Sequence, residues 1–285
     1  MADPTITAVP GVSVGHCTHA EAATGVTVLT FPEPNVAVVD VRGGAPGTRE
    51  TDALGAAIKP VTVNALMFAG GSAFGLAAAA GVSDEVEREG RGAPTPAGPV
   101  PIVPAAIVFD LMTGNPPGKP GPDDGAAAYR ARTTDPVALG RVGAGAGTTV
   151  AAWRGMEAIQ FAGIGSAAVK VGDATVGALV VLNAAGDIFS LDGTPLTGGE
   201  HASIAPPVGA MSTYLSGLYA NTPFHQMAEG FEAALPGPFR DGARRARQLV
   251  TGMPGGQGTL CLLYTSPSPR DIEVHRVCRL LLEKG

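Results

Sequence analysis

Alternating apolar and polar positions predict short strands along much of the chain. β-Branched residues are frequent in these segments, and Gly and Pro separate them. The segments 159–170 and 175–183 are the most apolar, and they predict a pair of central strands. Seven segments have a strand pattern: 12–16, 25–30, 35–41, 61–68, 107–111, 159–170 and 175–183.

Small-residue and periodic segments predict helices between and after these strands. Ser72 is the predicted N-cap of a helix that runs through the alanines at 77–80 to about Glu89. The segments 126–132, 226–235 and 241–250 predict further helices. Because strands come first and strict βαβ alternation is absent, the pattern predicts a layered α+β sandwich.

Composition and charge exclude several classes of protein. The 285 residues are 45% hydrophobic and 15% charged with a net charge of −6, which does not describe a disordered chain. The acidic balance offers no basic field for nucleic acid, and the arginines at 240–247 stand beside Asp241 and Glu232 as a solvated helix face. Since apolar runs are short and interrupted, we expect no membrane partner.

The start of the chain and its cysteines predict a cytoplasmic protein. Residues 1–4 lack the cationic and apolar regions of a secretory signal. The three cysteines, Cys17, Cys261 and Cys278, are an odd number without a CxxC pair, which fits a reducing compartment.

Composition changes abruptly near residue 260. Residues 261–285 contain no Ala, and their only Gly is Gly285. The segment 261–271 resembles one reading frame of the transposon-end adapter used to prepare sequencing libraries. We therefore expect 261–285 to be a non-native tail; the alternative is a natural Ser/Pro linker before a short helix.

Glycine-rich segments do not complete the common nucleotide or hydrolase motifs. The segment 143–147 lacks GxGxxG spacing, and 70–76 lacks the Lys of a P-loop. Gly165-Ser166-Ala167 does not complete a GxSxG elbow. The two glycine-rich loops instead offer backbone N–H groups that suit a carboxylate or an oxyanion.

Polar residues at strand ends are further candidates for chemistry. His16, Cys17 and His19 are expected to diverge from one another, and no fourth ligand stands nearby, so we predict no metal site. Asn183 ends the most apolar strand, so its amide must be hydrogen-bonded or serve a site. A cap on the turn over 183–186 is the alternative.

Six segments occur in a specific order: 10–16, 42–52, 69–76, 100–111, 143–147 and 180–183. Together they resemble the DmpA-like aminopeptidases, which include L-aminopeptidase/D-esterases, β-peptidyl aminopeptidases and nylon-oligomer hydrolases. The resemblance spans about residues 10–260. It implies an αββα sandwich like that of N-terminal nucleophile hydrolases, incomplete here at the C-terminus, with self-cleavage into two subunits and homo-oligomeric assembly.

The resemblance also implies the residues of an active site. In that family the chain cuts itself before a Ser or Thr, and Gly258-Thr259 fits this step. Residues 1–258 then form the large subunit, 259–260 begin the small one, and the freed α-amino group of Thr259 acts as base for its own hydroxyl. Asn183 matches the asparagine that faces the oxyanion, a donor worth about 3 kcal/mol. Gly145 and Gly147 are the predicted substrate-binding positions.

Two departures from the family pattern affect this expectation. Some members carry a Lys after the glycine-rich loop, where this chain has Arg154, and whether Arg154 replaces it stays open. The groups that orient the nucleophile in the family follow it in the small subunit, so we expect this chain to be inactive. Asn221-Thr222 is a second candidate step, less favoured because Pro223 follows and no apolar strand begins there.

The sequence therefore predicts a cofactor-free hydrolase of N-terminal residues or small amides and esters, with a small peptide or amide as its partner. Two alternatives stay open. One is a non-enzymatic small-molecule binding protein on the same scaffold. The other is an acyltransferase like the ornithine acetyltransferases.

Overall fold

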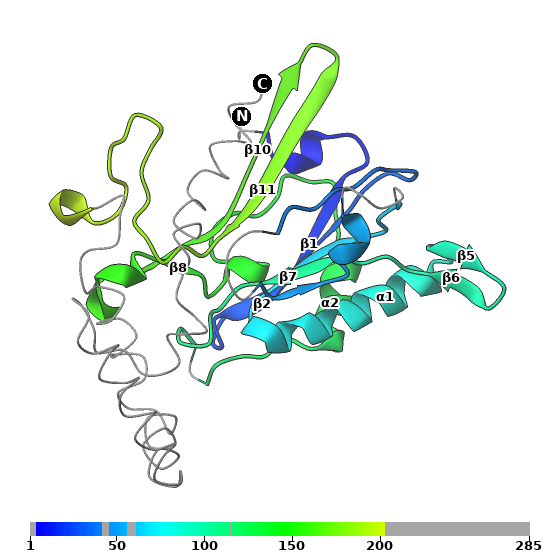
Figure 1. Cartoon of the computed structure of the whole chain (residues 1–285), viewed down its shortest axis with the longest axis horizontal. Helices are drawn as coiled ribbons and strands as arrows, with labels where there is room; N and C mark the ends of the chain where they lie inside the picture. Colours follow the sequence, from blue (N-terminus) through cyan, green and yellow to red (C-terminus); the bar gives the residue numbers. More distant parts are fainter. Residues whose placement is uncertain (1–3, 42–45, 56–60, 115, 203–285) are drawn as a thin grey trace, which may run out of the picture. The chain divides into compact units, whose positions relative to one another are not determined.

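The computed structural model describes residues 4–41, 46–55, 61–114 and 116–202 (Figure 1). These residues belong to two compact units. The first unit comprises Met1–Val41, Pro46–Thr149 and Phe161–Asn183, and the second comprises Arg42–Ala45, Val150–Gln160 and Ala184–Gly285. The predicted helices over 226–235 and 241–250 lie outside the described residues.

A five-stranded sheet in the order β1-β2-β4-β7-β3 forms the centre of the first unit. β4 and β7 are parallel, and the other neighbouring pairs are antiparallel. Every residue of β2 is buried, as expected for an inner strand of a sheet covered on both faces. The strands are β1 (Ser13–His19), β2 (Thr24–Thr30), β3 (Thr48–Arg49), β4 (Leu66–Ala69) and β7 (Ala105–Ile107).

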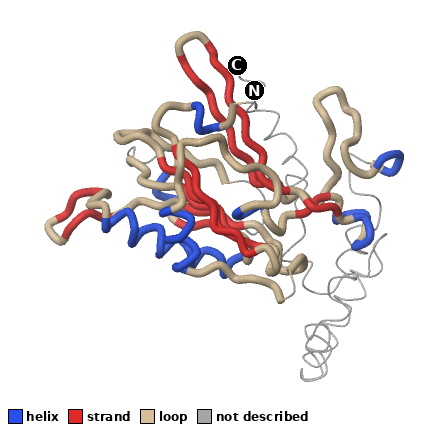
Figure 2. Tube along the Cα trace, turned by 180° about the vertical axis from the view of Figure 1, so that it is seen from behind, coloured by secondary structure: helices blue, strands red, loops and turns tan. Residues whose placement is uncertain are grey.

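Two helices pack on one face of this sheet, α1 (Ala78–Arg88) and α2 (Pro122–Arg130) (Figure 2). Their backbones approach closely because each helix presents a glycine to the other. A Cβ atom at Gly81 would lie 1.8 Å from the carbonyl oxygen of Pro122. The core between the helices and the sheet is apolar, and it includes Val26, Val28, Met67, Ala78, Val82, Val86, Val103 and Tyr129.

The opposite face of the sheet carries a second core, formed by residues that include Val14, Leu29 and Ile164. Ile164 belongs to the antiparallel hairpin of β10 (Gly163–Val171) and β11 (Ala174–Leu182). This pairing confirms the strand pair predicted over 159–170 and 175–183. Within the described residues, however, the hairpin is a separate two-stranded sheet rather than the centre of a larger one.

Shorter elements complete the described chain. β5 (Ala93–Thr95) pairs with β6 (Gly98–Val100), and β8 (Thr149–Val150) pairs with β9 (Gln160–Phe161). Seven 3-10 helices also occur: η1 (Ile6–Ala8), η2 (Asp52–Leu54), η3 (Ser72–Ala77), η4 (Gly143–Gly145), η5 (Ala152–Arg154), η6 (Met156–Ala158) and η7 (Gly199–His201). No helix in the described part of the chain is long and apolar enough to cross a membrane.

Two predicted elements are shifted: the strand predicted over 61–68 is β4, which begins at Leu66, and the helix predicted over 126–132 is α2, Pro122–Arg130. Three others differ more strongly. The segment 35–41 is not a strand. Val36 and Val38 are each 77% exposed, so the apolar positions of its alternating pattern do not pack into the core. The strand predicted over 107–111 ends at Ile107, because the chain turns to bury Asp110. Ser72 begins the 3-10 helix η3 rather than capping an α-helix, and its backbone N–H donates to the carbonyl of Val108.

The α+β class predicted from the pattern is confirmed. The first unit places a helix pair on one face of a mixed sheet, and it packs the base of the β10–β11 hairpin on the other face.

Candidate active site

A buried carboxylate, Asp110, connects the glycine-bearing segment 69–76 with strand β2. Its Oδ1 accepts a hydrogen bond from the backbone N–H of Gly71 at 2.6 Å, and its Oδ2 accepts one from the hydroxyl of Thr24 at 2.7 Å. Burial raises the pKa of Asp110, although both hydrogen bonds act in the opposite direction. A Cβ atom at Gly70 would lie 1.9 Å from Oδ2, so only glycine fits beside this carboxylate.

The glycine-rich segment 143–147 lies against the first two strands. Thr18 accepts a hydrogen bond from the N–H of Gly143 at 2.8 Å, and Thr27 accepts one from the N–H of Ala144 at 3.0 Å. Gly143 has a φ of 50°, and a Cβ atom there would lie 2.3 Å from the Thr27 hydroxyl. The absence of side chains is therefore what lets this segment rest on β1 and β2.

Gly145 and Gly147, the predicted substrate-binding positions, are both buried. A Cβ atom on Gly145 would lie 2.7 Å from the backbone nitrogen of Ile164, and one on Gly147 would lie 1.8 Å from the carbonyl oxygen of Ala23. The Thr113 hydroxyl donates to the carbonyl of Gly147 at 3.0 Å. Both glycines therefore have a packing role, and their part in substrate binding stays a prediction.

Asn183 follows β11, and its side-chain amide links two of these segments. Its Oδ1 accepts a hydrogen bond from the N–H of Thr149 at 3.0 Å, and its Nδ2 donates to the carbonyl of Phe109 at 3.2 Å. The amide therefore joins Thr149, two residues after the glycine-rich segment, to Phe109, the residue before Asp110, rather than capping the turn over 183–186. An amide NH₂ group has two N–H bonds, and among the described residues only Phe109 accepts one.

Hydrogen bonds thus bring three of the six family segments together. Segment 69–76 meets segment 100–111 at Asp110, and segment 100–111 meets Asn183 at Phe109. Thr149, the other partner of Asn183, lies two residues after the glycine-rich segment 143–147. Asp110 was not among the site residues predicted from the sequence. An acidic residue directly after the apolar run over 105–109 is the signal by which it could have been found.

His16 contacts Thr27, the residue of β2 that binds the glycine-rich segment. Its Nδ1 lies 3.0 Å from the Thr27 hydroxyl, which also accepts from Ala144. The Thr27 hydroxyl can donate to Nδ1 while it accepts from Ala144, provided that the ring proton is on Nε2. Nε2 is buried and has no hydrogen-bond partner in the described residues. Burial lowers the pKa of His16 and therefore favours the neutral ring.

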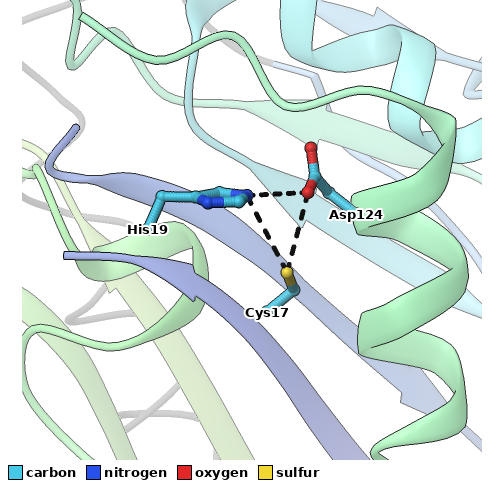
Figure 3. A group of neighbouring side chains, drawn as sticks. All are labelled: Cys17, His19 and Asp124. Atoms are coloured by element: carbon cyan, nitrogen blue, oxygen red, sulfur yellow. Dashed lines mark hydrogen bonds and ion pairs between the residues drawn. The ribbon is translucent and has the colours of Figure 1, made fainter. Parts of the chain in front are cut away.

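The expected divergence of the strand-end side chains is wrong for Cys17 and His19. They are two residues apart on β1 and therefore point to the same face of the sheet. Both side chains meet Asp124 of α2, and the ligand atoms of the three residues lie within 4.8 Å of one another (Figure 3). Burial, together with the neighbouring Asp124, raises the pKa of the Cys17 thiol, which disfavours Cys17 as a nucleophile.

Arg154 belongs to the second unit, where it forms an ion pair. Its Nε and Nη2 each lie 3.0 Å from Oδ1 of Asp187, which is fully buried. Thr197 donates its hydroxyl proton to the same oxygen at 3.0 Å. The guanidinium thus forms its ion pair within its own unit. Whether Arg154 replaces the family lysine stays open. Gly258, Thr259 and Thr222 lie outside the described residues.

Comparison with known proteins agrees with the resemblance seen in the sequence. Residues 4–226 match the model of a family described as Peptidase family S58. The chain belongs to peptidase family S58. The members of such a family are hydrolases of C–N bonds, which confirms the predicted enzyme class at the level of the family.

Curated relatives of this S58 chain include two proteins with informative names. An uncharacterized aminopeptidase of Mycobacterium tuberculosis is 42% identical over 241 residues, which cover 77% of this chain and 67% of that protein. A 6-aminohexanoate-oligomer endohydrolase of Paenarthrobacter ureafaciens is 32% identical over 197 residues, covering 68% of this chain and 52% of that protein.

A solved protein of Pyrococcus horikoshii shares the fold, with a TM-score of 0.50 and 22% identity over 64% of this chain and 55% of that one. A Burkholderia β-aminopeptidase aligns with a TM-score of 0.47 and 25% identity over 62% of this chain and 51% of that one. The S58 chain thus spans about two thirds of its mycobacterial relative and about half of these solved chains.

Proposed function

We propose that this chain is the large-subunit region of a self-processing aminopeptidase or amidase that acts through an acyl-enzyme on Thr259. The observation that carries the proposal is the convergence, in one unit, of segments 69–76 and 100–111 with Asn183 and with Thr149, which follows the glycine-rich segment. Family membership and the names of the two curated relatives support the same class of chemistry.

The first step of the proposed chemistry is self-cleavage. The hydroxyl of Thr259 attacks the carbonyl carbon of Gly258, and the peptide bond becomes an ester as the nitrogen of Thr259 takes up the proton. Water then hydrolyses the ester, which frees the α-amino group of Thr259. That amine has an ordinary pKa near 8 and can accept the hydroxyl proton at neutral pH.

The second step repeats the attack on an external amide. The Thr259 hydroxyl adds to the substrate carbonyl, its proton passes through the α-amino group to the leaving amine, and water hydrolyses the resulting ester. The Asn183 N–H that Phe109 does not accept is the proposed donor to the oxyanion. Such a donor typically contributes about 3 kcal/mol to the transition state. The substrates that this chemistry suits are N-terminal residues of small peptides and small amides or esters.

Assembly into a homo-oligomer belongs to the same proposal. The far half of the β10–β11 hairpin exposes Val169, Val171 and Val176, each more than half accessible. Val169 and Val176 are direct cross-strand partners, so they form one apolar surface. Exposed apolar surface of this kind supports contact with another chain.

The test uses the 260 residues followed by their natural continuation, obtained by resequencing the 3′ end of the gene. We expect two chains on a denaturing gel, a new N-terminus at Thr259, and release of nitroaniline from amino-acid nitroanilides. T259A should abolish both cleavage and hydrolysis. N183A should lower kcat about 100-fold or more while the protein keeps its fold. A new N-terminus at Thr222 would move the nucleophile to that residue.

The same preparation distinguishes the two alternatives. A binding protein would stay a single uncleaved chain while still binding small molecules. An acyltransferase would transfer the acyl group to an added amino acid rather than to water, which product analysis by mass spectrometry would show.

A further inference from the structure

The cluster of Cys17, His19 and Asp124 plays no part in the proposed hydrolysis. Nε2 of His19 lies 2.7 Å from Oδ1 of Asp124 and 4.0 Å from Sγ of Cys17. Sγ of Cys17 lies 3.8 Å from the same carboxylate oxygen. Figure 3 shows the three side chains directed at one point between the end of β1 and the start of α2. These residues supply a sulfur, a nitrogen and an oxygen ligand.

We propose that Cys17, His19 and Asp124 form a binding site for a divalent transition-metal ion, with zinc as the best match. Zinc accepts thiolate, imidazole and carboxylate ligands in tetrahedral geometry, and three protein ligands leave the fourth position for water. Two anionic ligands and one neutral ligand balance the charge of a divalent ion.

The distances fit such an ion after small adjustments. Tetrahedral zinc with normal bond lengths separates sulfur from nitrogen or oxygen by about 3.6 Å, and nitrogen from oxygen by about 3.3 Å. The observed separations of 4.0, 3.8 and 2.7 Å each differ from these values by about 0.2–0.6 Å. The His19 side chain is 46% exposed, so it is free to move by that amount.

The surroundings orient the carboxylate as a metal site requires. Oδ2 of Asp124 accepts a hydrogen bond from the backbone N–H of Gly121 at 2.8 Å, which leaves Oδ1 to face Cys17 and His19. Such outer contacts fix the ligands of known metal sites. Metal binding would replace the hydrogen bonds inside the cluster: the thiol releases its proton to solvent, and His19 keeps its single ring proton on Nδ1.

A metal here would also stabilise the candidate active site. Thr18 stands between the two ligands on β1, and its hydroxyl accepts the hydrogen bond from Gly143. His16, the next residue on that face, contacts Thr27 beneath the same glycine-rich segment. An ion that joins Cys17 and His19 to α2 would therefore fix the strand on which the segment rests.

Cobalt titration of the full chain tests the proposal, in a C261S/C278S background that leaves Cys17 as the only thiol. We expect one equivalent of cobalt to give a thiolate-to-cobalt charge-transfer band and the intense visible bands of four-coordinate cobalt. One equivalent of zinc should remove both. C17S should abolish the charge-transfer band, and H19Q and D124N should each raise the dissociation constant at least about tenfold.

H201A is the matched control, because His201 also pairs with a carboxylate, Glu200 at 3.5 Å, and the double-serine background leaves Cys17 of β1 as the chain's only cysteine. It should leave the titration unchanged. H19Q alters an exposed side chain, so it keeps the test valid if C17S impairs folding. Absence of the charge-transfer band, or a band that persists in both C17S and H19Q, would overturn the proposal.

Discussion

Asp110 is the residue whose loss should disturb the candidate site most directly, because two donors depend on its buried carboxylate. D110A leaves the Thr24 hydroxyl and the Gly71 N–H without this acceptor. Each buried polar group that loses its partner lowers the free energy of unfolding by about 1–3 kcal/mol. D110N keeps one acceptor and should cost less. We expect the urea midpoint to fall in the order wild type, D110N, D110A. D173N, at the exposed hairpin turn, is the control, and equal midpoints for D110A and D173N would refute this ranking.

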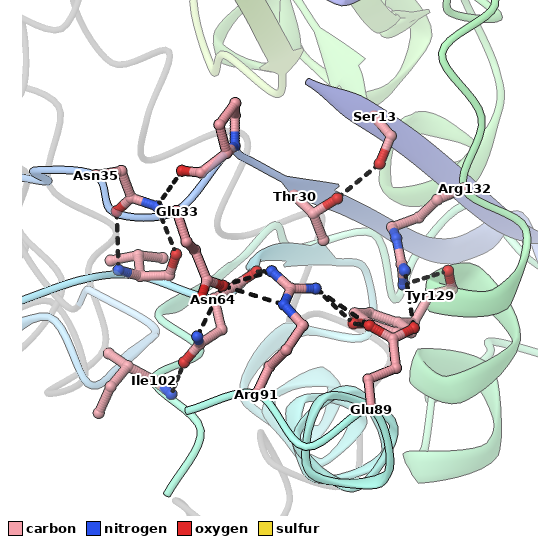
Figure 4. Close-up of polar contacts among 12 residues, drawn as sticks. Ser13, Thr30, Glu33, Asn35, Asn64, Glu89, Arg91, Ile102, Tyr129 and Arg132 are labelled. Carbon is pink, nitrogen blue, oxygen red and sulfur yellow. Dashed lines mark hydrogen bonds and ion pairs between the residues drawn. The ribbon is translucent and has the colours of Figure 1, made fainter. Parts of the chain in front are cut away.

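Tyr129 gives a pH-dependent prediction. Burial, followed by its hydrogen bond to Glu89 at 2.6 Å, raises the pKa of Tyr129 to about 12 (Figure 4). The folded pKa exceeds the ordinary value of 10.0, so this residue's contribution to stability is fully present below pH 10 and is lost between about pH 10 and 12. The stability difference between wild type and Y129F should shrink over that range. Urea unfolding of both proteins at several pH values measures it, and a constant difference would contradict the prediction.

The close contact of α1 with α2 depends on glycine. Replacing Gly by Ala within a helix normally stabilises the folded protein by up to about 1 kcal/mol, but the opposite is expected here. In G81A the new Cβ would lie 1.8 Å from the Pro122 carbonyl oxygen, so the two helices must move apart. Such overpacking typically lowers the free energy of unfolding by about 1–3 kcal/mol. We expect a lower melting temperature for G81A. G165A is the control, since no atom lies within 4 Å of a Cβ there; an equal effect of both changes would count against the packing argument.

Strands that pair with a neighbouring strand were predictable from their alternation, whereas alternation without such a partner gave a wrong prediction. The pairing of 159–170 with 175–183 follows from strong alternation and a tight turn. The segment 35–41 has the same alternation but finds no neighbouring strand in the described part of the chain. The Cys17–His19 pair was missed because His16, Cys17 and His19 were treated as one divergent group. Cys17 and His19 alone are two residues apart and therefore share a face of the strand, and their third partner, Asp124, is distant in sequence.

The candidate site is harder to predict than the strands because it is assembled from distant segments. The hydrophobic pattern predicts where β11 lies, but not that Phe109 and Asn183, separated by 74 positions, share a hydrogen bond. Periodicity also could not reveal that Asp110 is buried between Thr24 and Gly71. The combination of motifs predicted that Asn183 belongs to a site, and the structure shows its amide bonded to Thr149 and Phe109. Its catalytic role stays a prediction until kinetics test it.

Processing is a property of the whole molecule, since it requires nucleophile, base and oxyanion donor to lie within hydrogen-bond reach at once. If residues 261–285 are a non-native tail, as their composition predicts, they do not supply the groups that orient Thr259 in the family. We expect the 285-residue chain to remain one uncleaved species by intact mass and to release no nitroaniline. The same 260 residues with their natural continuation should divide at Gly258-Thr259, and T259S should still be cleaved whereas T259A should not. A processed and active product from the 285-residue chain would show that its tail is natural.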